Sequence, residues 1–468
     1  MRFGPVLMFR GLAERSVRLA ALVVRDDDSR PPALTAGGRS HPALRLATVA
    51  GHGVWRYDFA LPLGTVSDYG LAGRTHRVDT RYEGDLHVGF VSCNGEENGD
   101  LDRDADERNA MWQRLRAQHA TRPLHVLLHG GDQVYADEAT DGHRLSDGWP
   151  DELPETAAPA DLDDLRLHLR ERFLHRYAIT YAAPGFAELA AEVPSLMMWD
   201  DHDICDGWGS LGDVERTAIG QTLFRTAREA FLLYQHAATD DDVPDLFLDP
   251  EGLSLGFRRD LPGLTILAPD LRSERTRARI MGPNGWDRFD AALADLQERV
   301  FLVSSVPLLG PRLSLVERLM QLTRRMERYE DDLRDQWQSR AHRAEWARML
   351  RRLIDVEARG HRVTAISGEI HLATRATLDT GRPEPLHQLV ASGISHRAPP
   401  RLYAMTLGTL ARFGEAPIPE HPIRIAPLPG QRHNYTAERN YLTLARKRGT
   451  WSARWDLEDS GTTGWLSI

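Results

Sequence analysis

Cysteine is scarce in this 468-residue chain, and it contains no long apolar run. Only Cys93 and Cys205 are present, too few for the disulfide framework of a small secreted domain, so they are free thiols, a single bridge or ligands. No apolar stretch approaches the roughly 20 residues that a membrane-spanning helix needs. The first ten residues lack the basic, apolar and small-residue order of a signal peptide. We therefore expect a cytoplasmic protein without a membrane span.

Positive charge is also in deficit. The chain has 58 Lys and Arg against 68 Asp and Glu, a formal net charge of -10, which argues against a stable nucleic-acid partner. With 41% hydrophobic and 27% charged residues, the composition is that of an ordinary globular protein. The length allows one large catalytic domain with a smaller one, or two to three domains of middle size.

The first 86 residues contain short β-like runs separated by turn signals. The runs cover residues 17–24, 55–61 and 76–82, and the second alternates polar and apolar residues with a period of two. The pair Gly37-Gly38 marks a turn between them. This spacing predicts a small antiparallel β-sandwich domain over residues 1–86, followed by a catalytic domain over residues 87–468.

From Leu86 onward, short apolar runs alternate with helical patterns. The runs, at residues 87–92, 125–129, 195–199, 264–268 and 363–367, have the length of buried strands in a helix-covered sheet. Helical patterns cover residues 108–120, 162–174, 216–236, 286–300 and much of 314–359. The dense charges at residues 327–335 are typical of a solvated helix face. The class is therefore α/β.

Each of these runs ends in a loop that carries metal-compatible side chains. In open α/β sheets, ligands gather at the carboxyl ends of the strands, so the five loops describe one candidate site. The loops are Ser92-Cys93-Asn94, Gly131-Asp132-Gln133-Val134-Tyr135, Asp200-Asp201-His202-Asp203, Asp270-Leu271-Arg272 and Gly368-Glu369-Ile370-His371.

Asp132 is the most specific candidate metal ligand of this site. A carboxylate can bridge two cations, and the glycines before Asp132 let the turn pass close to them. Tyr135 adds a phenolate, a hard ligand suited to Fe(III). An Asp that caps the following helix would explain the same residues equally well.

Asp201, His202 and Asp206 belong to a second group, in which carboxylates crowd around an imidazole. Such crowding is costly without a cation, because neighbouring like charges raise each other's pKa. Metal binding or acid–base work is therefore favoured over a solvated acidic loop.

The remaining candidates are weaker on their own. Glu369 and His371, two positions apart, face the same way in an extended chain. Cys93 is by itself more often a small buried residue than a ligand, and Cys205 is read as packing. Arg272 is a candidate clamp for phosphate oxygens or one half of a surface ion pair. Arg272, His396 and Asn94 are the predicted substrate contacts.

In their order along the chain, these motifs resemble those of the PhoD-like alkaline phosphatase/phosphodiesterase family of calcineurin-like metallophosphatases. The motifs are Ser92-Cys93-Asn94-Gly95, His129-Gly130-Gly131-Asp132-Gln133-Val134-Tyr135, Trp199-Asp200-Asp201-His202-Asp203, Asp270-Leu271-Arg272 and Ser367-Gly368-Glu369-Ile370-His371. The resemblance covers about residues 87 to 400 and implies a four-layer α/β sandwich. The β-rich N-terminus also resembles the small sandwich domain that these enzymes often carry.

The resemblance also implies a binuclear metal centre. Cys93, Asp132, Tyr135 and His371 would hold a first metal, expected to be Fe(III). Asp132 would bridge to a second ion, Ca or another divalent cation such as Mn, Zn or Co. That second ion would be held by Glu369 together with Asp201 or Asp206, and His202 would be the catalytic imidazole.

Two departures from the family pattern bear on these expectations. The family usually has Asp at the position of Glu369, and the longer side chain would shift or weaken the second metal. Exported members carry a twin-arginine signal, which this chain lacks.

The predicted function is hydrolysis of small phosphate monoesters or diesters by a metal-bound hydroxide. Two alternatives remain. One is a phosphodiesterase specific for lipid headgroups or nucleotides, and the other is a metal-binding pseudoenzyme with a sensing or interaction role.

Overall fold

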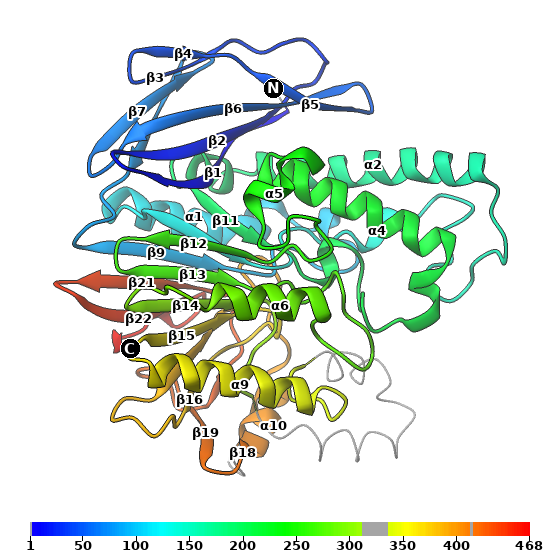
Figure 1. The fold of residues 1–468 in the computed structure, drawn as a ribbon. Helices are drawn as coiled ribbons and strands as arrows, with labels where there is room; N and C mark the ends of the chain where they lie inside the picture. The colour runs from blue at the N-terminus through cyan, green and yellow to red at the C-terminus, as the bar shows by residue number, and fades with distance from the viewer. Residues whose placement is uncertain (1, 311–335, 412–414) are drawn as a thin grey trace.

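The computed structural model describes residues 2–310, 336–411 and 415–468. Two large β-sheets pack face to face, with helices on their outer faces (Figure 1). Strand β14 (Arg299–Ser304) illustrates how the sequence builds these layers. Val300 and Leu302 pack into the core under the helices, whereas Phe301 and Val303 pack into the core shared with the other sheet. Because successive side chains of a strand point to opposite faces, this apolar run buries both faces and confirms the predicted four-layer α/β sandwich.

The first sheet has the strand order β23-β22-β21-β9-β10-β11-β1-β2-β6-β5, with β24 beside β22. Its centre is parallel, since β10 pairs in parallel with both β9 and β11. The strands are β1 (Phe3–Ala13), β2 (Ser16–Val24), β5 (Leu44–Val49), β6 (His52–Pro62), β9 (Leu86–Val91), β10 (Val126–Gly130), β11 (Ser195–Met198), β21 (Asn440–Lys447), β22 (Thr450–Leu457), β23 (Gly461–Thr462) and β24 (Leu466–Ser467).

The second sheet has the order β12-β13-β14-β15-β17-β16-β19-β18, with β20 beside β16. Strands β13, β14, β15 and β17 are parallel neighbours. Besides β14, the strands are β12 (Phe257–Leu261), β13 (Leu264–Ala268), β15 (Arg362–Ser367), β16 (Ala373–Leu378), β17 (Leu386–Val390), β18 (Glu415–Ile418), β19 (His421–Ala426) and β20 (Tyr435–Thr436).

The helices lie on the outer faces of the two sheets. Trp286 of α6 and Trp346 of α9 pack under the second sheet, and these helices cross it in the view of Figure 1. Helices α1, α2 and α3 cover the first sheet, with Trp112, Phe173 and Phe186 in its core. The described helices are α1 (Ala105–Thr121), α2 (Pro159–Ala182), α3 (Phe186–Ala190), α4 (Ala218–Ala230), α5 (Val243–Leu246), α6 (Pro283–Ala292), α9 (Arg343–Ala358) and α10 (Arg401–Ala411).

The N-terminal strands are continuous with the first sheet. Met8 of β1 pairs in parallel with Ser195 of β11, and β2, β6 and β5 extend the sheet from there. A small separate sheet contains β3 (Leu34–Ala36), β4 (Arg39–His41), β7 (Val66–Leu71) and β8 (Arg74–Asp79), in the order β4-β3-β7-β8. It forms the top of the molecule in Figure 1, with Tyr69 and Val78 in the same core as Phe9. The predicted domain boundary at residue 86 stays a prediction. The first sheet and its hydrophobic core both contain residues from before and after that position.

Two expectations about elements need correction. The helix predicted over 286–300 ends at Ala292, because the apolar run that follows Arg299 is strand β14. Strand β1 was not anticipated, because Gly4 and Pro5 hide the apolar pattern at its start. Residues 314–335 of the last predicted helical stretch, with the charges at 327–335, lie outside the described residues, and α9 covers Arg343–Ala358.

Candidate metal centre

The predicted site residues lie at one end of the two sheets, where five parallel strands finish. Strands β9, β10 and β11 lead into the loops of Cys93, Asp132 and Asp201. Across the interface, β15 leads into the Glu369–His371 loop and β17 into the His396 loop. Hydrogen bonds join the two halves, since the Ser92 hydroxyl donates to the carbonyl oxygen of Ala391 at 3.1 Å.

Strained backbone is concentrated in these loops. Nine non-glycine residues among those described have positive φ, and four of them are predicted metal ligands: Cys93 (56°), Asp132 (53°), Glu369 (67°) and His371 (53°). Such conformations cost on the order of 1–3 kcal/mol each and cluster at functional sites. The loops are also tightly apposed, because a Cβ on Gly131 would lie 2.7 Å from the Cβ of Asp200.

Asp132 is the buried carboxylate at the centre of the site. Its Oδ2 accepts a hydrogen bond from the Cys93 thiol at 3.4 Å, while its Oδ1 is buried without a hydrogen-bond partner. Burial and the charge of Asp200 raise the pKa of Asp132 well above its ordinary value. Ligand-type atoms of Asp132, Asp200 and Asp201 all lie within 4.8 Å of one another. This crowding of buried carboxylates is the arrangement that a cation relieves.

The other three predicted ligands of the first metal are Cys93, which contacts Asp132, and Tyr135 and His371, which contact each other. The Cys93 thiol lies 3.1 Å from the Ser392 hydroxyl, and burial raises its pKa. The Tyr135 hydroxyl lies 3.0 Å from Nε2 of His371. Burial and the neighbouring Cys93 raise the pKa of Tyr135 well above its ordinary value. Cys93 therefore lies beside Asp132 and Tyr135 beside His371, but among the described residues no close group of ligand atoms contains Cys93 or joins Asp132 to His371. That these four residues hold the first metal stays a prediction.

His202 stacks on the Tyr135 ring, with the centroids 4.2 Å apart, and pairs with Asp137. The Nδ1 of His202 lies 3.0 and 3.1 Å from the two carboxylate oxygens of Asp137. Burial by itself would lower the pKa of His202, but the charges of Asp137 and Asp201 outweigh it and raise the pKa well above its ordinary value. The predicted ligand Asp206 is close by, in a group with Asp201 and His202 whose ligand atoms lie within 4.8 Å of one another.

Asp137 and Glu97 are not among the predicted site residues, and Asp203 is predicted only as a member of the Asp200–Asp203 loop. Asp203 accepts hydrogen bonds from the backbone N–H groups of Asp132, Gln133 and Val134 at 2.9, 3.0 and 3.2 Å. Its place beside Asp201 and His202 in the sequence indicated that Asp203 belongs to the site. It did not indicate that the carboxylate holds the backbone of the Asp132 loop.

Two predicted substrate contacts have other partners in the structure. Arg272 is fully buried, with its guanidinium paired to Asp200 and 3.1 Å from Asp201. The side-chain oxygen of Asn94 accepts hydrogen bonds from Trp112 at 2.7 Å and Ser395 at 2.8 Å. Both side chains hold the loops of the site together, and their contact with a substrate stays a prediction.

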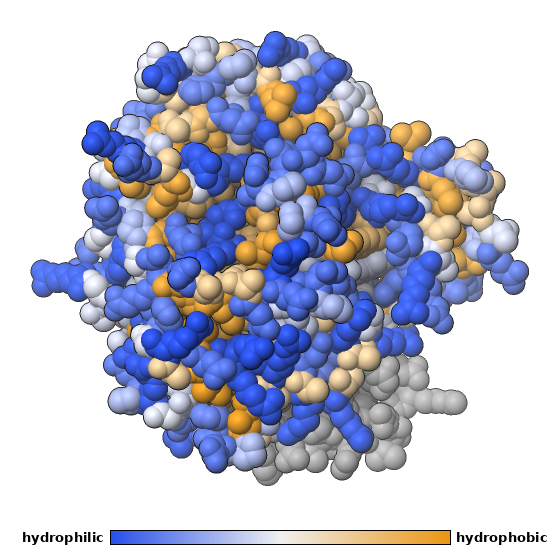
Figure 2. Space-filling view, in the orientation of Figure 1, coloured by the Kyte–Doolittle hydropathy of each residue, from blue (hydrophilic) through white to orange (hydrophobic). Residues whose placement is uncertain are grey.

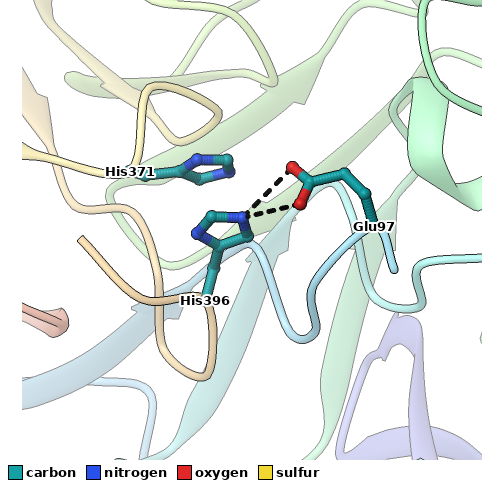
Figure 3. A group of neighbouring side chains, drawn as sticks. All are labelled: Glu97, His371 and His396. Carbon is teal, nitrogen blue, oxygen red and sulfur yellow. Dashed lines mark hydrogen bonds and ion pairs between the residues drawn. The ribbon is translucent and has the colours of Figure 1, made fainter. Parts of the chain in front are cut away.

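Glu369 and His396 lie at the rim of this arrangement. The Glu369 carboxylate accepts a hydrogen bond from the Gln336 side chain at 2.7 Å. Among the residues described, it does not belong to any of the close groups that could hold a metal ion. His396 lies against His371 and pairs with Glu97 (Figure 3).

The donor set fits the metals that the family resemblance implies. The Cys93 thiol and the carboxylates of Asp200 and Asp201 lie close to Asp132, whose Oδ1 is buried without a hydrogen-bond partner. The phenol of Tyr135 and the imidazole of His371, 3.0 Å apart, add an oxygen and a nitrogen donor to the same set of loops. Hard oxygen donors suit Fe(III) and Ca, and imidazole and thiolate suit a transition metal. The residues present can therefore hold metal ions, and their number and identity stay predictions.

The chain is similar in sequence and in fold to known proteins. A yeast protein (Saccharomyces cerevisiae) described as "Uncharacterized protein YGR266W" is 24% identical over 395 residues. The match covers 68% of this chain but 55% of the yeast protein, so the chain spans about half the length of that relative.

Two solved structures share the fold. The structure of PhoD matches with a TM-score of 0.59 and 11% identity, covering 99% of this chain and 88% of the other. The purple acid phosphatase PPD1 from yellow lupin (Lupinus luteus) seeds matches with a TM-score of 0.53 and 10% identity, covering 99% and 73%. At such low identity the likeness establishes the metallophosphatase fold alone. The family model of the PhoD related phosphatases matches residues 67–329, more than half of the sequence, and the chain belongs to that family.

Proposed function

We propose that the protein is a metal-dependent phosphoesterase that hydrolyses small phosphate monoesters, diesters or both. The observation that carries the proposal is the position of the buried Asp132 carboxylate. It accepts a hydrogen bond from the Cys93 thiol and lies in a close group of ligand-type atoms with Asp200 and Asp201, with one oxygen free of hydrogen bonds. A family of phosphatases with this fold supports the same reaction class.

Cys93, Asp132, Tyr135 and His371 would hold a first metal, expected to be Fe(III). Asp132 would also reach a second ion, Ca or another divalent cation, for which the close grouping of Asp132 with Asp201 favours Asp201 over Asp206 as a further ligand. Cations bound there lower the pKa of water toward neutrality and neutralise phosphoryl oxygens.

His202 would act on the leaving group. Its Nδ1–H donates to Asp137, which leaves Nε2–H to donate a proton to the departing oxygen. The charges of Asp137 and Asp201 raise the pKa of His202 well above its ordinary value, which favours the protonated imidazole. Asp137 would be a positioning residue that fixes the ring and its charge.

Activity assays with two model substrates test the proposal. Purified protein should hydrolyse p-nitrophenyl phosphate, bis-p-nitrophenyl phosphate or both when Fe, Ca, Mn, Zn or Co is supplied. The ratio of the two rates distinguishes a monoesterase from a diesterase acting on headgroups or nucleotides. Absence of hydrolysis with every metal would sink the proposal.

A metal-binding pseudoenzyme is favoured by one observation, the position of Glu369 outside the close carboxylate groups. In a pseudoenzyme, Glu369→Asp would not change the amount of bound metal, and the protein would still have no activity. In an enzyme whose second metal is weakened by the longer side chain, Glu369→Asp should raise both the metal content and the rate. Elemental analysis of both proteins separates the two.

A further inference from the structure

A cavity of about 360 Å³ lies where helix α2 meets the start of β1 and the turn between β5 and β6. Its volume falls within the range of about 300–1,000 Å³ that is typical of small-molecule sites. None of the predicted metal ligands lines it, so it is separate from the candidate metal centre. Its polar lining consists of Arg2, His52, His168, Glu171, Arg172 and His175.

The charge of this lining is mostly positive. Two guanidinium groups and three imidazoles face the cavity, whereas Glu171 is its one carboxylate, and Asp26 lies near Arg2 but outside the lining. Within the described ranges of the chain, neither Arg2 nor Arg172 forms an ion pair with a carboxylate. Burial and the charges of these two guanidiniums lower the pKa of His175, so the three groups are close to one another. An anion between them would relieve the repulsion of like charges.

Hydrogen bonds hold both guanidinium groups in position. Because a guanidinium can only donate, Nε2 of His52 accepts from Arg2 at 2.9 Å, and its Nδ1–H donates to the carbonyl oxygen of Arg25 at 3.1 Å. On α2, Arg172 donates to the carbonyl oxygen of Glu138 at 2.6 Å. A guanidinium has five N–H groups, so each of these side chains keeps further donors for a ligand. Donors that are fixed before binding lose less conformational entropy when an anion arrives.

We propose that the cavity between Arg2, Arg172 and His175 binds the phosphate group of a small anion, either free orthophosphate or a phosphorylated organic molecule. The oxygens of a phosphate point in tetrahedral directions, and these donors reach the cavity from the start of β1 and from α2. The planar fork of a guanidinium matches two phosphate oxygens at once. The site does not depend on the phosphoesterase activity, since it contains no residue of the metal centre.

Phosphate binding to metal-free protein tests the site. Chelator-treated Asp132→Asn protein is used, so that bound metal does not hold the anion elsewhere, and calorimetric titration gives the Kd of inorganic phosphate and of glycerol 3-phosphate. In this background Arg2→Gln and Arg172→Gln should each weaken binding about 10–100-fold, the usual worth of a hydrogen bond between charged groups. Arg166→Gln is the matched control, because it removes the same charge from α2 but pairs with Glu229 outside this cavity.

The proposal is supported if one equivalent of either anion binds and Arg2→Gln weakens that binding while Arg166→Gln does not. Arg2→Gln decides by itself if Arg172→Gln fails to fold for want of its contact with Glu138. Binding of both anions indicates a site for free phosphate, and binding of glycerol 3-phosphate alone indicates a site for phosphorylated organic molecules.

Two results would overturn the proposal. In the first, neither anion binds at millimolar concentration. In the second, Arg2→Gln binds as tightly as its background or no more weakly than Arg166→Gln, because the attraction would then come from overall charge and not from this cavity. The measurement is bound anion, so a protein without phosphatase activity can still pass this test.

Discussion

At the scale of single residues, the site combines groups that are costly to bury alone. Asp132 is buried with one oxygen unpaired, and its backbone is in the left-handed region. Its pKa is raised well above its ordinary value by burial and by Asp200, so the charged form is unstable without a cation. We therefore expect Asp132 to be ionised when a metal ion is bound and protonated when the metal is removed.

Replacing Asp132 by Asn should remove both bound metal and activity. The amide keeps the shape but supplies no charge to bridge two cations, so we expect the metal content measured by elemental analysis to fall together with the rate. Asp213→Asn is the control, because that side chain is fully exposed. A variant with full metal content and unchanged rate would contradict the proposed centre.

Replacing His202 by Gln should slow substrates with strongly basic leaving groups most. General acid catalysis contributes roughly 10²–10⁴-fold, and p-nitrophenolate needs little protonation to depart. We expect a large loss of kcat on an alkyl phosphate and a smaller one on p-nitrophenyl phosphate. Asp137→Asn should give an intermediate loss with an altered pH profile. Equal losses on both substrates would show that His202 does not protonate the leaving group.

At the scale of elements, Asp203 fixes the loop that carries Asp132. Its carboxylate caps three successive backbone N–H groups and also accepts from Gln235 at 2.8 Å. In an Asn side chain, an NH₂ group would replace one of the two carboxylate oxygens. That NH₂ group would face backbone N–H donors and could not accept their hydrogen bonds.

We expect Asp203→Asn to lower the free energy of unfolding by about 1–3 kcal/mol, the cost of leaving a buried polar group unpaired. Urea denaturation of the chelator-treated protein measures this, with Asp213→Asn as the exposed control. A change no larger than that of the control would mean that the loop is held by other contacts.

At the scale of the whole molecule, buried neutral histidines make the fold sensitive to acid. Burial lowers the pKa of both His125 and His129 from 6.5 to about 4. Below pH 6.5 the unfolded chain takes up protons that the folded chain takes up only near pH 4. The contribution of these two histidines to stability is therefore fully present above pH 6.5 and is lost as the pH falls from 6.5 towards 4.

This acid sensitivity should be smaller in His125→Asn. The Asn oxygen can replace Nδ1 as the acceptor for the His87 N–H, which lies 3.0 Å away, without titrating. The Tm of chelator-treated protein, followed from pH 7 to pH 4.5, should fall less steeply in this variant. His433→Asn, at an exposed position, should keep the original slope. Identical slopes for all three proteins would contradict the assignment to His125.

Removing residues 1–86 should prevent the remaining chain from folding as a soluble monomer. Truncation would uncover the edge of β11 and would remove the apolar side chains of β1, such as Leu7 and Phe9, from the core that they share with the rest of the chain. Soluble yield and size-exclusion profiles of residues 87–468 measure the effect. A monodisperse, folded fragment would instead establish residue 86 as a true domain boundary.

The surface of the molecule is mostly hydrophilic on the face drawn in Figure 2. Hydrophobic residues are scattered between the hydrophilic ones there. In the described part of the chain, no helix has the length and apolar character that crossing a membrane requires.

The sequence alone determined which residue types stand at the strand ends and in what order. Apolar runs of about five residues identified β9, β10, β11, β13 and β15, because buried strands have that length and composition. The loops that follow them supplied Cys93, Asp132, Tyr135 and His371, of which Cys93 contacts Asp132 and Tyr135 contacts His371 in the structure. Periodicity failed where two elements adjoin, as at β14, and where Gly4 and Pro5 interrupt the pattern of β1.

The tertiary structure decided which side chains meet. Asp137 reaches His202 across 65 positions, and Glu97 reaches His396 across 299, separations at which no local pattern predicts a contact. It also buried Arg272 against Asp200 and tied Asn94 to Trp112. The type of a residue and its place at a strand end are local properties, whereas its partners depend on how the two sheets pack against each other.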